Sequence, residues 1–174
     1  MTTVYVELSK LGAQYRMLGP RMKTACLRGA MAGALRAVTT LHRATGQAPP
    51  ANPAGKGTGG AVNTGHYKRS WKAERLPDGA RVHNTAPYSG VIEHGRRPGA
   101  RMPPPKILVG WIQRRLSVSR ERAEELSWPF ARAIARRGLL PRKVLTNSIP
   151  DITKGLMEEV EAELEKELAR GGAP

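Results

Sequence analysis

Apolar residues recur at helical spacing near both ends of the chain, and these two stripes constrain the fold more than any other feature. The first predicts a helix from about Pro20 to Ala44, ended by Gly46, with the members Leu27, Met31, Ala34, Leu35, Val38 and Leu41. The second predicts a last helix that starts at Ile149–Pro150–Asp151, with the members Ile152, Leu156, Val160, Leu164 and Leu168. Because a lone amphipathic helix is marginal in water, the last helix must dock on its own domain or on a neighbouring subunit. Its acidic outer face favours a basic neighbour.

Two glycines, Gly29 and Gly33, lie inside the first predicted helix. Each weakens a helix by about 1 kcal/mol relative to alanine. Alternatively, the small residues allow another helix to pack closely at this point.

Between the two stripes, turn residues and alternation predict a β-hairpin. Ser70–Leu76 has the pattern of a strand, and Ala80–Asn84 that of a returning strand with Val82 facing inward. The turn signal Pro77–Asp78–Gly79 joins them. Thr3–Leu8 alternates weakly, which indicates a short strand or an extended arm.

Several shorter segments complete the predicted organisation. The pattern predicts a helical turn through Arg69 capped near Thr64, a short helix Pro87–His94 ended by Gly95, a helix Pro105–Leu116, and a helix capped by Ser119, containing Pro129 and ended by Gly138. Pro141–Thr146 fits a short strand or an extended arm. Gln47–Ala61 is rich in glycine and proline, so we expect it to be mobile, and it lacks the pattern of a phosphate-binding loop.

The length and charge of the chain narrow the function classes. Its 174 residues suit one domain, residues 1–174, with the last helix near residues 150–169. The formal net charge is +15, yet the tail from Asn147 onward carries seven acids and three bases. This asymmetry indicates a polyanion near the body of the protein, or an acidic partner surface. No apolar run of about 18 residues and no signal peptide pattern is present, so we expect synthesis in the cytoplasm and no membrane partner.

Candidate catalytic groups are few. His66, His83, His94 and Glu93 share one region, but their spacing matches no metal-binding motif, and surface histidines are the better interpretation. Cys26 is the single cysteine, and its neighbours indicate a buried helix face. No nucleophile-elbow motif occurs. We therefore expect a non-enzymatic protein with no catalytic residues, cofactor or metal.

Three segments carry a resemblance to a known family. Thr64–Trp71 (TGHYKRSW) resembles a T-G-x-L-[RK]-x-S-[IW] motif, Asn84–Gly95 (NTAPYSGVIEHG) resembles N-x-A-P-Y-A-x-x-[VI]-E-x-G, and Gly138–Leu145 (GLLPRKVL) resembles G-x-x-P-R-P-F-L. The motifs belong to the head–tail joining proteins of tailed bacteriophages, also called neck or tail-completion proteins. They occur here in the order of that family, with a final helix after the third.

The resemblance implies an α+β fold, a small antiparallel sheet packed by helices, and a ring of about six or twelve copies between the portal side and the tail. Neighbours would be head-completion and tail-terminator or tail-tube proteins, with non-specific contact to the genomic DNA in the channel. The matched positions are Thr64, Gly65, Tyr67, Ser70, Pro87, Tyr88, Glu93, Gly95, Pro141 and Arg142. Of these, Gly65, Pro87 and Gly95 are expected to maintain the fold, and Tyr88, Glu93 and Arg142 to lie at interfaces.

The predicted location is the neck of the virion, assembled in the host cytoplasm. Our hypothesis is that Arg96, Arg97 and Arg101, in a basic loop rich in proline, face DNA or an acidic neighbouring ring. Two alternatives stay open: a tail terminator or minor tail protein, and a free protein that binds DNA independently of sequence. The second shares the charge but shows no helix-turn-helix, zinc finger or aromatic RNA-binding platform.

Overall fold

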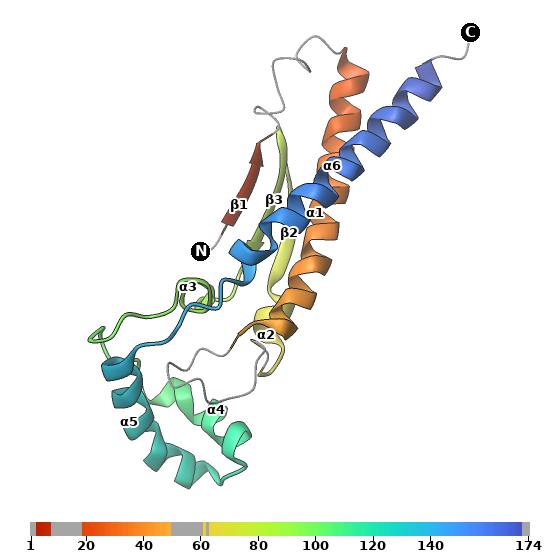
Figure 1. Ribbon diagram of the computed structural model, residues 1–174. Coiled ribbons are helices and arrows are strands. Elements are labelled where there is room, and N and C mark those ends of the chain that lie inside the picture. Colours follow the sequence, from red (N-terminus) through yellow and green to blue (C-terminus); the bar gives the residue numbers. More distant parts are fainter. Residues whose placement is uncertain (1–2, 8–18, 50–60, 62, 172–174) are drawn as a thin grey trace.

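The computed structural model describes residues 3–7, 19–49, 61 and 63–171 of the chain. The fold of this part is α+β, as predicted (Figure 1). Its elements are β1 (Thr3–Glu7), α1 (Pro20–Gln47), α2 (His66–Arg69), β2 (Trp71–Leu76), β3 (Gly79–Asn84), α3 (Ser89–His94), α4 (Lys106–Leu116), α5 (Arg120–Arg137) and α6 (Val144–Gly171). The segment 47–61, which we expected to be mobile, lies mainly outside the described ranges.

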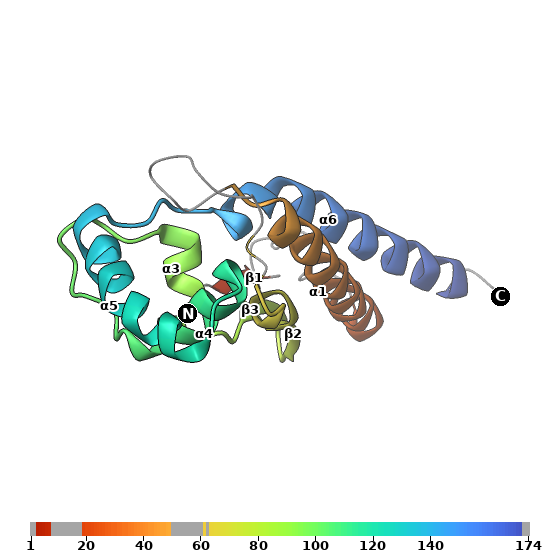
Figure 2. The ribbon, with the colours of Figure 1, turned by 90° about the horizontal axis from the view of Figure 1, so that it is seen from below.

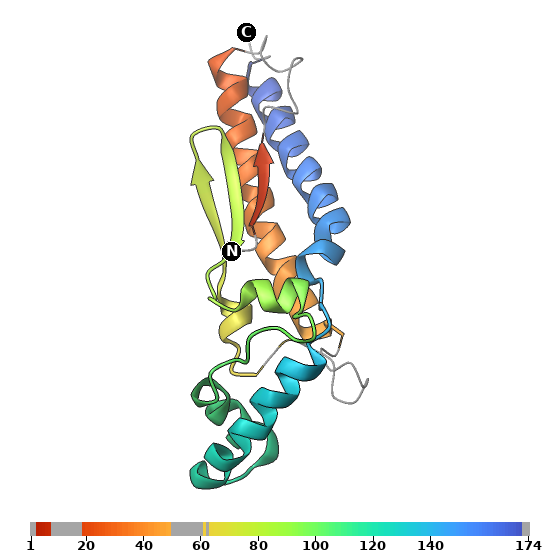
Figure 3. The ribbon, with the colours of Figure 1, turned by 90° about the vertical axis from the view of Figure 1, so that its left-hand side faces the viewer.

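The sheet is antiparallel with the strand order β1–β3–β2 (Figure 3). Leu76 pairs with Gly79, so the two residues between them form the tight turn of the predicted hairpin. Thr3–Glu7 is a strand paired with β3, which decides between the two predictions for this segment. In β3, Ala80 and Val82 are buried while Arg81 and His83 are half-buried, as alternation requires.

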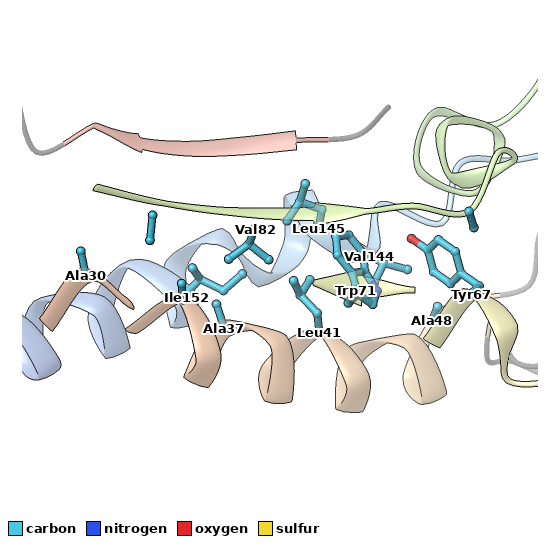
Figure 4. Packing of buried hydrophobic residues seen from close by; sticks show 13 residues of the cluster. Ala30, Ala37, Leu41, Ala48, Tyr67, Trp71, Val82, Val144, Leu145 and Ile152 are labelled. Carbon is cyan, nitrogen blue, oxygen red and sulfur yellow. The ribbon is translucent and has the colours of Figure 1, made fainter. Parts of the chain in front are cut away.

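The hydrophobic core lies between the sheet, α1 and the beginning of α6, so the fold has one layer of strands and one of helices (Figures 1 and 4). Trp71 from β2 and Leu41 from α1 are its largest fully buried apolar side chains. Val82, Leu145 and Ile152 close the core from β3 and α6 (Figure 4). A second apolar cluster continues between α1 and α6 beyond the sheet, and it consists of Ala25, Cys26, Leu156, Val160 and Leu164.

The last helix docks on its own domain. α1 and α6 run antiparallel, with the start of α1 beside the end of α6 (Figure 1). A Cβ atom on Gly29 would lie 2.6 Å from the Cα of Val160, and one on Gly33 would lie 2.9 Å from the Cα of Leu156. Of the two interpretations of these glycines, the structure therefore supports the second, in which they allow another helix to pack closely. Leu168, the last member of the predicted stripe, is exposed because a four-residue repeat drifts around the helix.

Ion pairs reinforce this contact and use much of the acidic face of α6. Arg28 in α1 binds Glu163 and Glu167 with nitrogen–oxygen distances of 2.9 Å each. Arg36 binds Glu158 at 2.7 Å and Glu159 at 3.3 Å. The basic neighbour expected for the acidic helix is thus, for these four carboxylates, α1 of the same chain.

The arginine pairs predict a dependence of stability on pH. Hydrogen bonds from Lys166 and then from Arg28 lower the pKa of Glu163. A carboxyl whose pKa is lower in the folded state stabilises the fold above its unfolded pKa, and this contribution disappears as the pH falls through the folded pKa. We expect the urea midpoint of Arg28→Met to fall less than that of the unmodified protein when the pH is lowered from about 5 to about 3. Arg120→Met, which breaks an exposed pair with Glu124 in α5, is the matched control. Parallel curves for Arg28→Met and the unmodified protein would contradict the prediction.

The predicted end of α1 and the predicted start of α6 are wrong. α1 continues through Gly46 and ends at Gln47, because the terminating signal is Pro49, which holds Ala48 in an extended conformation (φ −57°, ψ 142°). α6 begins at Val144, so it includes residues predicted as a strand or arm, and Pro150 lies inside it. The first turn of α6 is held by the carboxylate of Glu93, a partner that local sequence cannot reveal.

The helices α4 and α5 form a hairpin that projects from the rest of the molecule (Figures 1 and 2). They pack mainly against each other, through the fully buried Ile112, Ala123 and Ala131. Ser119 caps α5 by accepting a hydrogen bond from the amide of Arg122, and Gly138 ends it, both as predicted. Within the described ranges, no helix is long and apolar enough to cross a membrane.

Candidate functional site: a motif junction and a basic hairpin

The three segments that resemble the motifs, residues 64–71, 84–95 and 138–145, meet in one place, which we call the motif junction. Asn84 links the first two segments, because its side-chain amide donates to the carbonyl of Tyr67 at 2.9 Å. The same side chain accepts from the amide of Ala86 at 2.9 Å. The amide of Thr85 also donates to the carbonyl of Ser70 at 2.9 Å. The helical turn α2 and the chain after β3 are thus fixed to each other.

The third segment is attached through backbone hydrogen bonds. Arg96 and Leu139 exchange two of them at 2.8 Å each, and the amide of Arg142 donates to the carbonyl of Ile92 at 2.9 Å. Gly95 and Gly138 border this bridge with φ angles of 71° and 72°. A Cβ atom would lie 2.4 Å from the carbonyl oxygen of Leu139 at Gly95, and 2.3 Å from that of Arg96 at Gly138. Both positions therefore require glycine, in conformation and in space.

Glu93 is the central side chain of the junction and is only 1% exposed. One carboxylate oxygen accepts from the amide of Leu145 at 2.9 Å. The other accepts from the amide and the hydroxyl of Thr146 at 2.8 and 2.7 Å. The carboxylate thus satisfies donors in the first turn of α6, where the helix dipole favours negative charge. Glu93, which we expected at an interface, instead joins α3 to α6 inside the protein.

Burial and neighbouring charges shift the pKa values of two further residues of the junction, Tyr67 and Arg142. Burial raises the pKa of Tyr67, and the negative charge of Glu93 raises it further, while Arg142 acts in the opposite direction. Burial also lowers the pKa of Arg142, which is half-buried. The ring of Tyr67 packs edge-on against Trp71, with ring centroids 5.7 Å apart. Tyr67 and Arg142 therefore belong to the packed part of the junction.

Other matched residues lie at its rim. Thr64 is exposed, and its hydroxyl accepts from the amide of His66 at 3.4 Å, while Gly65 occupies the cap position of α2 with φ 75°. The hydroxyl of Ser70 donates to the carbonyl of His66. The helix predicted to start at Pro87 starts at Ser89, because Pro87 and Tyr88 form the turn that precedes α3. The side chain of Tyr88 is 42% exposed. Of the three residues expected at interfaces, Tyr88 is the one available to a partner.

The histidines and the cysteine that the sequence singled out occupy different environments. His66 and His94 are exposed, and Nδ1 of His83 lies 4.0 Å from a carboxylate oxygen of Glu74 on the polar face of the sheet. The described ranges contain no group of three His, Cys, Asp or Glu residues that could hold a metal ion. Cys26 lies in α1, where burial raises the pKa of its thiol and so disfavours the reactive thiolate.

Residues 96–143, which we call the basic hairpin, comprise α4, α5 and their connections to the motif junction. They contain thirteen arginines and lysines and three glutamates, so they carry +10 of the net charge of +15. Ion pairs inside the hairpin include Arg120–Glu124 and Arg122–Glu125. Exposed basic side chains outside these pairs include Arg97, Arg101, Arg132, Arg136 and Arg137. The strongest unbalanced charge thus lies on the projecting part of the molecule.

The three arginines predicted to face a partner have different environments. Arg97 and Arg101 are exposed, whereas Arg96 is half-buried and its Nε atom is shielded from solvent. Arg96 and Arg101 line a hollow together with Ile107 and the residues between, Met102, Pro103, Pro104 and Pro105. Exposed apolar side chains of the hairpin that the sequence analysis did not single out include Ile107 at 67% and Trp128 at 53%. The exposure of Trp128 could have been predicted, because this residue falls outside the helical spacing of the buried face of α5.

No family model, curated protein or solved structure matches this chain. The functional proposal therefore rests on the motif junction, the basic hairpin and the resemblance of the three motifs.

Proposed function

We propose that this protein is a structural component of the neck of a tailed phage, where copies form a ring that joins head to tail around the DNA channel. The observation that carries the proposal is the convergence of all three motif segments on one hydrogen-bonded junction. The contacts of Glu93 with Leu145 and Thr146 join segments 52 and 53 residues apart in sequence, so chain proximity alone does not explain this convergence. Their joint role is to hold the basic hairpin and α6 in fixed positions on the sheet.

The positive charge of the basic hairpin favours a position of this hairpin beside DNA or an acidic protein. Arg97 and Arg101 are exposed on the loop before α4, and Arg132, Arg136 and Arg137 are exposed on α5. Such charges contact phosphates without reading sequence, which suits a channel through which any genome passes. The junction itself contributes rigidity to this function.

Deletion of the gene from the phage or prophage that encodes the chain tests the proposal. We expect filled heads and separate tails of normal length in electron micrographs, with joined particles restored by the unmodified gene. A gene for Arg96→Ala, Arg97→Ala and Arg101→Ala should restore infectivity less well, by about tenfold or more if these side chains contact DNA or an acidic ring. Joined, infectious particles without the gene would overturn the neck function, and overlong tails would favour a tail terminator.

Free sequence-independent DNA binding is the second candidate, and the unbalanced arginines of the basic hairpin favour it. It predicts that the isolated protein binds duplex DNA with a steep salt dependence. The neck function predicts that its phenotype is confined to particle assembly.

A further inference from the structure

The outer face of α5 carries an exposed stripe of one aromatic and two basic residues. Trp128, Arg132 and Arg136 follow at intervals of four residues, and the side chain of Trp128 is 53% exposed. Residues at this spacing share one helix face, at steps of about 6 Å along the axis. The buried face of the helix is formed instead by Ala123, Ser127 and Ala131. The stripe therefore points away from α4.

A stripe of opposite charge lies on the outer face of α6. Met157 and Leu168 are 37% and 62% exposed, and Glu161 and Glu165 lie between them and are exposed too. Within the described part of the chain, the ion pairs to α1 use other carboxylates of α6, namely Glu158, Glu159, Glu163 and Glu167. The charges of Glu161 and Glu165 are therefore not neutralised by α1.

The two stripes are complementary in spacing and in chemistry. Trp128 is followed by arginines four and eight positions later, and Met157 is followed by glutamates four and eight positions later. Side by side, an apolar pair and two opposite-charge pairs would meet at the same axial intervals. In this contact Met157 would cover the apolar ring of Trp128, whereas a phosphate backbone offers the ring no apolar surface.

One chain cannot bring its own two stripes together in this fold. α5 lies at one end of the elongated molecule, and the outer half of α6 lies at the other end (Figures 1 and 2). We propose that the Trp128–Arg132–Arg136 stripe of one copy binds the Met157–Glu161–Glu165–Leu168 stripe of the next copy. Because the contact joins two different surfaces, an assembly of joined copies keeps one free surface of each kind, one at each end, and copies can add until a ring closes. The role of this contact, as the lateral contact of the neck ring, rests on the proposed function.

Charge reversal on each stripe tests the contact by sedimentation velocity. The unmodified protein is expected to form oligomers at concentrations on the order of 100 μM. The variants Arg132→Glu/Arg136→Glu and Glu161→Lys/Glu165→Lys should each raise the dissociation constant about tenfold or more, because like charges then face each other. An equimolar mixture of the two variants should associate again, since each reversed stripe finds its complement on the other variant.

Arg43→Glu/Lys72→Glu is the matched control, because it reverses two exposed charges on α1 and β2 and should leave association unchanged. The contact is wrong if the unmodified protein stays monomeric at that concentration, or if the mixture fails to associate. It is also wrong if Arg132→Glu/Arg136→Glu weakens binding to duplex DNA but leaves the oligomers intact. The neck function fails separately: association as expected, together with joined particles after gene deletion, would reject the function and keep the contact.

Discussion

Glu93→Ala should destabilise the protein by about 3 kcal/mol, since hydrogen bonds to a charged group contribute about 1.5–3 kcal/mol and unsatisfied buried donors add a penalty. The carboxylate of Glu93 accepts from two amides and one hydroxyl at the start of α6, at distances between 2.7 and 2.9 Å. Alanine leaves the amide of Leu145, which is buried, without this partner. It also removes the negative charge from the positive end of the helix dipole.

Thermal and urea unfolding measure this effect, and a loss of about 3 kcal/mol corresponds to a fall of roughly 6–12 °C in Tm for a chain of this size. Glu93→Gln keeps the shape but can accept on only one atom, so it should lie between alanine and the unmodified protein. Asp151→Ala removes an exposed carboxylate from the same helix and should change Tm little. Equal Tm values for Glu93→Ala and Asp151→Ala would show that the carboxylate does not hold α6.

The β-hairpin and the ends of α5 could be predicted because their determinants are local. The turn between Leu76 and Gly79 fixes the register of two strands by itself. Ser119 and Gly138 act on backbone groups within the adjacent turn of helix. The start of α6 could not be predicted, because its cap, Glu93, is 52 residues away from Leu145 in sequence.

Charge shows the same division between what local sequence determines and what folding determines. The acidic tail and basic body predicted a contact with a partner of opposite sign, and part of that contact is internal, between α6 and the arginines Arg28 and Arg36 of α1. The sequence does not show which carboxylates of α6 are paired with α1, whereas the fold shows that Glu161 and Glu165 are not among them. The charge available to partners is thus concentrated on the basic hairpin and on one stripe of α6.

Gly29→Leu should also cost about 3 kcal/mol or more, because the side chain would enter space filled by the backbone of α6. A Cβ atom at position 29 would already lie 2.6 Å from the Cα of Val160 and 2.9 Å from the carbonyl oxygen of Glu159. Backbone atoms cannot turn aside as a flexible side chain can, so the two helices must separate. Separation opens the apolar cluster that includes Cys26 and Leu164, and it breaks the pairs of Arg28.

Alanine substitutions in α1 give the matched comparison, because glycine and alanine differ in helix propensity by about 1 kcal/mol in favour of alanine. At Gly46 nothing lies within 4 Å of the added Cβ atom, so Gly46→Ala should stabilise the protein by about that amount. At Gly29 the same gain is opposed by overpacking of about 1–3 kcal/mol, and the net effect should be destabilising. Urea unfolding of the two variants should therefore give shifts of opposite sign. If Gly29→Ala stabilised the protein as Gly46→Ala does, α1 and α6 would not be packed backbone to backbone at this position.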